Sequence, residues 1–278
     1  MGIAIVTDST SDIPQDLAER YRIQVVPNVM VIDGESLLDG EGISREEFYR
    51  RLPDMISPPT TATASSGVYQ KIYDSLFKQG ATEILSIHAS SLLSGIYNAA
   101  SLAAQSFDQQ VRVIDGEQIT LGLGFQVLAA AEAVARGMGM DEIITTILDV
   151  RRRVRVIAML DTLEYVRRSG RVSWAKARLG NLLRIKPFVE LRGGRVSSLG
   201  EARTRRKGIE RLRELLRELG SLDSLAVLHT NAERDAQAFL ASLEDIPAHP
   251  IIVNVTTIIG THVGPNGLGF AVVIRDPV

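Results

Sequence analysis

The chain has 278 residues, of which 45% are hydrophobic and 23% charged, and its formal net charge is −2. This composition predicts a folded protein of one large or two ordinary domains, and it excludes a disordered chain and gives no electrostatic argument for nucleic acid. The sequence contains no cysteine, which excludes disulfides and thiol catalysis and is typical of a reducing cytoplasm. Its apolar runs fall short of the roughly 20 residues that span a membrane, and acidic residues come too early for a signal peptide, so we expect a cytoplasmic protein.

The first half of the chain repeats a pattern of strand, polar turn and helix. Short apolar runs predict buried strands at residues 3–6, 84–87 and 111–114. Consecutive units of this kind predict right-handed crossovers and a parallel sheet. Because ligands bind outside the carboxyl ends of the strands in such sheets, we expect one rim to contain the turns at residues 7–12, 88–95 and 115–118.

Four other segments complete the first half. Residues 24–32 predict a strand that Pro27 bends or confines to an edge. The sequence SREE from Ser44 is a capping box and begins a helix. Residues 57–67 predict a polar loop, and Asp141 caps a helix that ends near residue 153.

The character of the chain changes near residue 154. Helices are predicted at residues 161–168, 174–183, 209–219 and 231–243. Strands are predicted at residues 155–160, 185–191, 195–199, 224–228, 251–259 and 268–274, with a hairpin turn at Gly193-Gly194 and a loop at 260–267. We therefore predict an α/β fold of two domains, an N-terminal parallel-sheet α/β domain (1–154) and a C-terminal α+β domain (155–278).

The turn SSLLSG at residues 90–95 has the strongest chemical character. Backbone N–H groups and the positive end of the following helix suit an anion, and three serine hydroxyls add donors. The same serines could instead serve only as helix caps. A serine hydrolase would need a base and a G-x-S-x-G elbow, whereas the pattern here is S-x-x-S-G and the nearby His88 lies at a strand end.

The other polar segments each allow a structural interpretation. Asp8 and Asp12 lack the D-x-D spacing of a phosphoryl-aspartate enzyme, so we interpret them as partners of turn N–H groups. The hydroxyl-rich residues 60–66 and the arginines around Gly170 and after residue 202 form either a ligand or partner surface or a solvated face. The four histidines show no ligand spacing, so we expect no metal and no cofactor, and a lone histidine such as His262 is more often structural than catalytic.

Together these stretches resemble the DegV family of bacterial fatty-acid-binding proteins. IAIVTDSTSDIP is similar to the family's N-terminal signature, PTTATAS to its P-K-T-S-Q-P-S loop and SSLLSGIYNAA to its S-S-x-L-S-G-T-Y-x-S-A stretch. LDTLEYVRRSGRVS, LLRIKP and GTHVGPNGLG match later landmarks in the same order. The resemblance therefore covers almost the whole chain.

The resemblance implies two domains with a long-chain fatty acid buried between them. The carboxylate would be held by Thr61 and Ser94, and the head-group rim would include His262, Arg171, Arg205 and Ser9. It further implies a non-enzymatic acyl carrier that presents the fatty acid to a separate fatty acid kinase for phospholipid synthesis. The alternative is a serine hydrolase or phosphotransferase acting at the same serine-rich rim.

The chain departs from the family pattern at several polar positions. The replacements are Ala62 for Ser, Ala64 for Pro, Ile96 for Thr, Ser169 for Gly and Arg184 for Asn. Thr61 and Ser94 are retained. The implied carboxylate pair is therefore intact, while the polar surroundings on which a kinase reaction would depend are altered.

Overall fold

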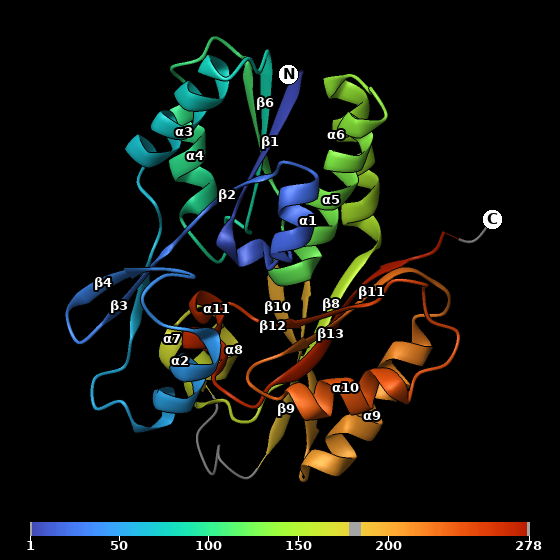
Figure 1. The fold of residues 1–278 in the computed structure, drawn as a ribbon. Helices are drawn as coiled ribbons and strands as arrows, with labels where there is room; N and C mark the ends of the chain where they lie inside the picture. The colour runs from blue at the N-terminus through green and yellow to red at the C-terminus, as the bar shows by residue number, and fades with distance from the viewer. Residues whose placement is uncertain (1, 178–184, 277–278) are drawn as a thin grey trace. The chain divides into compact units, whose positions relative to one another are not determined.

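The computed structural model describes residues 2–177 and 185–276, and the chain divides into two compact units (Figure 1). Unit 1 comprises Met1–Val29 and Ala62–Arg152, and unit 2 comprises Met30–Thr61 and Arg153–Val278. This division differs from the predicted domains of 1–154 and 155–278, because residues 30–61 belong to unit 2. They do so because Met30, Phe48 and Tyr49 share a hydrophobic cluster with Ile258.

Unit 1 is built on a parallel sheet of four strands in the order β2-β1-β6-β7. The strands are β1 (Ile3–Asp8), β2 (Gln24–Val26), β6 (Glu83–His88) and β7 (Val111–Asp115). The helices are η1 (Ser9–Ser11), α1 (Gln15–Arg20), α3 (Ser66–Lys78), α4 (Ile96–Ala104), α5 (Thr120–Ala135) and α6 (Met140–Arg153). Figure 1 shows α3 and α4 on one side of this sheet and α5 and α6 on the other. The parallel sheet predicted from the repeated strand–turn–helix pattern is confirmed.

Helix α5 is buried on nearly all sides, which its small and apolar residues permit. Gly124 lies so close to η1 that a Cβ atom there would come within 2.7 Å of the Ser11 carbonyl oxygen. A larger residue at 124 would therefore push η1 away from the end of β1.

The predicted strand at 24–32 is two strands that belong to different sheets. Strand β2 ends at Val26, and β3 (Val29–Ile32) joins β4 (Glu35–Leu38) and β5 (Thr60–Ala62) in the order β4-β3-β5. Pro27 lies between β2 and β3, where its missing N–H group costs no sheet hydrogen bond.

Unit 2 contains a sheet of six strands in the order β10-β9-β8-β13-β11-β12. The strands are β8 (Val154–Met159), β9 (Lys186–Arg192), β10 (Arg195–Ala202), β11 (Leu222–His229), β12 (Ile251–Asn254) and β13 (Leu268–Ile274). The helices are α2 (Arg45–Arg51), η2 (Leu52–Asp54), α7 (Glu164–Ser169), α8 (Ser173–Ala177), α9 (Arg205–Glu218), α10 (Glu233–Ala241) and α11 (Thr257–Val263). The β9–β10 hairpin with its Gly193-Gly194 turn is confirmed. The predicted helix at 174–183 lies partly outside the described residues, and Arg184 lies wholly outside them.

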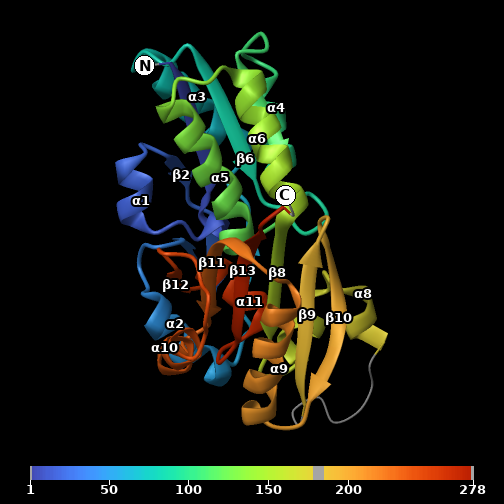
Figure 2. The same ribbon diagram turned by 90° about the vertical axis from the view of Figure 1, so that its right-hand side faces the viewer.

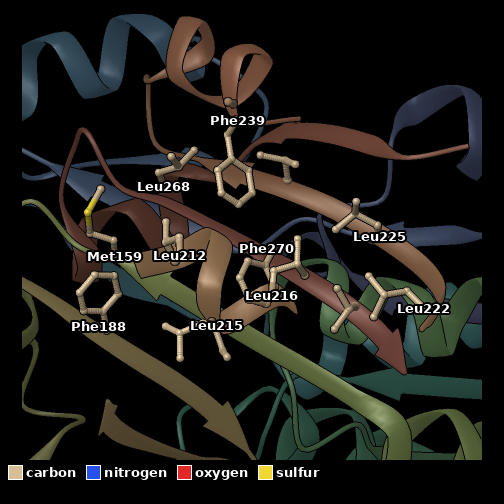
Figure 3. Packing of buried hydrophobic residues seen from close by; sticks show 14 residues of the cluster. Met159, Phe188, Leu212, Leu215, Leu216, Leu222, Leu225, Phe239, Leu268 and Phe270 are labelled. Atoms are coloured by element: carbon tan, nitrogen blue, oxygen red, sulfur yellow. The ribbon is translucent and has the colours of Figure 1, made fainter. Parts of the chain in front are cut away.

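Helices α9 and α10 cover one face of the six-stranded sheet. Figure 3 shows their apolar side chains packed with those of the strands, and Leu212, Leu216 and Phe239 meet Phe270 there. Leu212, Leu215 and Leu216 are buried, which confirms the apolar helix face predicted within residues 209–219. Among the described residues, no helix has the length and apolar character that crossing a membrane requires.

The prediction of a strand at 251–259 followed by a loop is wrong. Strand β12 ends at Asn254, and α11 begins at Thr257 with Thr256 as its N-cap, since the Thr256 hydroxyl accepts from the Ile258 N–H at 3.4 Å. The β-branched residues of this segment favour a strand locally, but the cap starts a helix. His262 therefore lies in the last turn of a helix and not in a loop.

Candidate functional site

The serine turn, which we define as residues 89–95, connects β6 to α4 at the carboxyl end of the parallel sheet. The Ser90 N–H donates to the Gln118 carbonyl at 3.0 Å, and the Ser91 N–H donates to the Asp115 carboxylate at 3.2 Å. The Ala89 N–H donates to the Asp8 carboxylate at 3.1 Å. These bonds bring the three predicted turns together on one rim of unit 1.

Ser94 is placed to donate a hydrogen bond from the start of α4. Its Oγ accepts from the Ile96 N–H at 3.3 Å, and its own N–H donates to the Ser90 carbonyl at 3.1 Å. A hydroxyl that accepts a backbone N–H keeps its own hydrogen for an external acceptor. Ser90 is fully buried and its Oγ accepts from the Leu92 N–H at 3.3 Å, so Ser90 stabilises the turn itself.

Within unit 2 the structure brings together two of the predicted site residues, Thr61 and His262. Thr61 lies in β5, and its Oγ1 is 2.9 Å from Nε2 of His262 in the last turn of α11. Burial, together with the positive charge of Arg171, lowers the pKa of His262 to about 4. The imidazole is therefore neutral at pH 7 and can donate to the Thr61 oxygen while the Thr61 hydroxyl donates elsewhere.

Helix α11 is held in place by two residues that sequence analysis missed, Asp39 and Tyr49. The Asp39 carboxylate accepts from the hydroxyls of Thr256 and Thr257, the latter at 2.9 Å, and so anchors the N-terminus of α11. The Tyr49 hydroxyl donates to the Val255 carbonyl at 2.8 Å. These partners are more than 200 positions apart in the sequence, so no local pattern could have indicated them.

The remaining predicted rim residues make structural contacts. Arg205 donates to the Asp235 carboxylate and to the Asn266 carbonyl, both at 2.6 Å. Arg171 is exposed and donates to the Ser169 carbonyl at 2.7 Å. Ser9 lies in η1 of unit 1, where its Oγ accepts from an N–H of the β2–β3 connection at 3.2 Å. Arg171 also acts on the Thr61–His262 pair, because its positive charge contributes to the lowered pKa of His262.

A buried hydrogen-bonded chain lies behind the serine turn. His88 Nδ1 is 3.0 Å from Asp8 Oδ2, and His88 Nε2 is 2.6 Å from Ser86 Oγ. The order of residues is that of a Ser–His–Asp triad, but all three side chains are 0% exposed. The arrangement therefore offers no accessible nucleophile. The interpretation of Asp8 as a partner of turn N–H groups is confirmed, since Asp8 accepts from the Thr10 N–H, but its pairing with His88 was not predicted.

The described residues contain no group of three or more His, Asp or Glu side chains that could hold a metal ion. The rim of unit 1 presents the Ser94 hydroxyl, whose oxygen accepts from the Ile96 N–H. Unit 2 separately presents the Thr61 hydroxyl, which is paired with a neutral imidazole. Neutral donors of this kind suit a carboxylate, which accepts hydrogen bonds only.

Comparison with known proteins decides the family. A family model described as "Uncharacterised protein, DegV family" matches residues 2–275. The chain belongs to the DegV family. A DegV domain-containing protein of Streptomyces coelicolor is 36% identical over 278 residues, covering 98% of this chain and 99% of that protein.

Solved DegV structures have the same fold over their whole length. A DegV family protein from Thermus thermophilus, described by its fatty acid binding, matches with a TM-score of 0.90 and 32% identity, covering 99% of this chain and 100% of that chain. DegV from Bacillus subtilis, described as a fatty acid binding protein, matches with a TM-score of 0.87 and 31% identity at the same coverage. The mixed α/β architecture is therefore that of this family.

Proposed function

We propose that this DegV protein binds a long-chain fatty acid whose carboxylate accepts hydrogen bonds from Thr61 and Ser94. The observation that carries the proposal is the full-length similarity to DegV proteins described as fatty acid binding. The local geometry supports it, since the Ser94 hydroxyl is oriented by the Ile96 N–H and the Thr61 hydroxyl by His262.

The acyl tail and the carboxylate contribute differently to the binding free energy. Burying about 14 methylenes at ~0.8 kcal/mol each contributes on the order of 11 kcal/mol, of which association consumes a large part. Hydrogen bonds from two hydroxyls to a carboxylate contribute a few kcal/mol and offset its desolvation. The tail therefore sets the affinity, and Thr61 and Ser94 set the orientation of the ligand.

We further propose that the protein is a carrier and not an enzyme. In this role it would present the fatty acid to a separate fatty acid kinase in the cytoplasm, and the acyl phosphate would then enter phospholipid synthesis. The complete burial of Ser86, His88 and Asp8 favours a carrier, because a hydrolase needs a nucleophile that the substrate can reach.

The test is a titration of delipidated protein with palmitate. Thr61→Ala combined with Ser94→Ala is expected to weaken binding by at least about tenfold, since each charge-assisted hydrogen bond contributes roughly 1.5–3 kcal/mol. Thr60→Ala is the matched control, because Thr60 is the exposed neighbour of Thr61 on β5, and it should bind as the wild type does. Unchanged affinity in the double variant would show that the carboxylate lies elsewhere.

A further inference from the structure

We propose that Asp8 is a positioning residue for the carboxylate-binding serine turn and acts on Ser94 through the Ala89 N–H. This inference rests on the proposed function, because it assigns Asp8 a role only if Ser94 holds the ligand. Asp8 ends β1, lies 80 positions before His88, and is 0% exposed. It does not itself reach the ligand.

The Asp8 carboxylate is surrounded by donors. Its Oδ1 accepts from the Thr10 N–H at 3.0 Å, from the Thr10 hydroxyl and from the Asn28 amide at 3.3 Å. Its Oδ2 accepts from His88 at 3.0 Å and from the Ala89 N–H at 3.1 Å. Burial alone would raise the pKa of Asp8, but these hydrogen bonds and the partner His88 outweigh burial and lower it. The carboxylate is therefore ionised, and it fixes the end of β1, the β2–β3 connection and the start of the serine turn.

Tyr73, Ser86 and His88 form a hydrogen-bonded chain that ends at Asp8. The Tyr73 hydroxyl donates to Ser86 Oγ at 2.8 Å, and Ser86 Oγ lies 2.6 Å from His88 Nε2. An imidazole with its hydrogen on Nδ1 accepts from Ser86 and donates to Asp8. This direction gives each group in the chain a partner, and the Ala89 N–H is bound by Asp8 directly and not by Ser86 or His88.

The effect on Ser94 passes through two backbone contacts. Asp8 holds Ala89, and the neighbouring Ser90 accepts from the Ser94 N–H at 3.1 Å. Loss of the Asp8 acceptor leaves the Ala89 N–H buried without a partner, which is costly and favours a shift of this segment. A shift at Ser90 moves Ser94 and misaligns its hydroxyl, so the loss should fall on ligands that carry a carboxylate.

The test compares palmitate with hexadecan-1-ol, which has the same tail but no carboxylate. Asp8→Ala is expected to lower palmitate affinity about tenfold and to leave hexadecan-1-ol affinity within twofold. Asp8→Asn should be intermediate, because its amide oxygen can still accept from Ala89, and it provides the same comparison if Asp8→Ala does not fold. A purely structural role for Asp8 would weaken both ligands equally.

Two reference variants make the outcome unambiguous. Ser86→Ala removes a buried hydroxyl from the far end of the same chain and is expected to lower stability without changing the palmitate-to-alcohol ratio. Ser94→Ala is expected to lower that ratio. The positioning role is wrong if Ser94→Ala lowers the palmitate-to-alcohol ratio and neither Asp8 variant does. It is also wrong if Ser86→Ala lowers this ratio as much as the Asp8 variants do. If Ser94→Ala has no effect on the ratio, the proposed carboxylate site fails and the inference about Asp8 fails with it.

Discussion

The neutral state of His262 is a property of its surroundings that can be measured. Burial and the charge of Arg171 lower the pKa of its imidazole to about 4 in the folded protein, against 6.5 in the unfolded chain. Between these values the unfolded chain binds more protons than the folded one, so the contribution of His262 to stability is present above pH 6.5 and is lost as the pH falls towards 4.

The variant His262→Gln isolates this contribution, because glutamine can bond to the Thr61 oxygen but does not titrate. We expect the free energy of unfolding of the wild type to fall more steeply between pH 7 and pH 5 than that of His262→Gln, as measured by urea denaturation. Parallel curves would show that His262 is not held neutral.

How far the site could be predicted depends on how local its residues are. Thr61 and Ser94 lie in short motifs whose members are adjacent in the chain, so the resemblance of these motifs to the DegV family indicated both as carboxylate donors, a role that stays a prediction. The partners that orient these regions could not be predicted in this way. Asp8 meets His88, and Asp39 meets Thr256, only because folding brings distant elements together.

At the scale of elements, the packing of α11 against α2 depends on a glycine. Gly260 lies in α11 directly over the Tyr49 ring, and a Cβ atom there would overlap the Tyr49 hydroxyl and ring carbons. We expect Gly260→Ala to destabilise the fold by ~1–3 kcal/mol through overpacking, and to weaken fatty acid binding because α11 carries His262. Thermal unfolding and palmitate titration measure the two effects.

Gly67 is the matched control for this substitution. It lies in the first turn of α3, and an added Cβ atom would be 3.8 Å from Ser65 Oγ, which is an ordinary van der Waals distance. Gly67→Ala should therefore leave stability unchanged or raise it by up to ~1 kcal/mol, since alanine favours a helix over glycine. Equal destabilisation by both substitutions would mean that the contact with Tyr49 is not the cause.

Elements were predictable where local pattern and tertiary packing agree. The parallel strands of unit 1 and the β9–β10 hairpin follow from buried apolar runs and a glycine turn. The segment after β12 was predicted wrongly because its β-branched residues favour a strand, while the Thr256 cap and the Asp39 carboxylate stabilise a helix. Tertiary contacts from another part of the chain decided that outcome.

At the scale of the whole molecule, the two units are not the two halves of the sequence. Residues 30–61 belong to unit 2 although they precede most of unit 1. A change of composition near residue 154 indicates the second boundary, which lies between Arg152 and Arg153. The first boundary, where the chain passes from unit 1 to unit 2 after Val29, depends on side chains such as Met30 that pack with Ile258. The composition of the sequence does not change at this boundary.

A bound fatty acid should stabilise the folded molecule by mass action. When free ligand exceeds the Kd about 100-fold, the gain is roughly 2.7 kcal/mol, which raises the Tm of a protein of this size by several degrees. We expect delipidation to lower the Tm and added oleate to restore it, as followed by scanning calorimetry. The Thr61→Ala and Ser94→Ala double variant should show a smaller response, and an equal response would argue against a role for these hydroxyls.

The most direct test of fatty acid binding is native mass spectrometry of the purified protein. We expect the intact protein to carry the additional mass of one long-chain fatty acid, which is released on denaturation. Repeated preparations without bound lipid, together with no uptake of added palmitate or oleate, would contradict it.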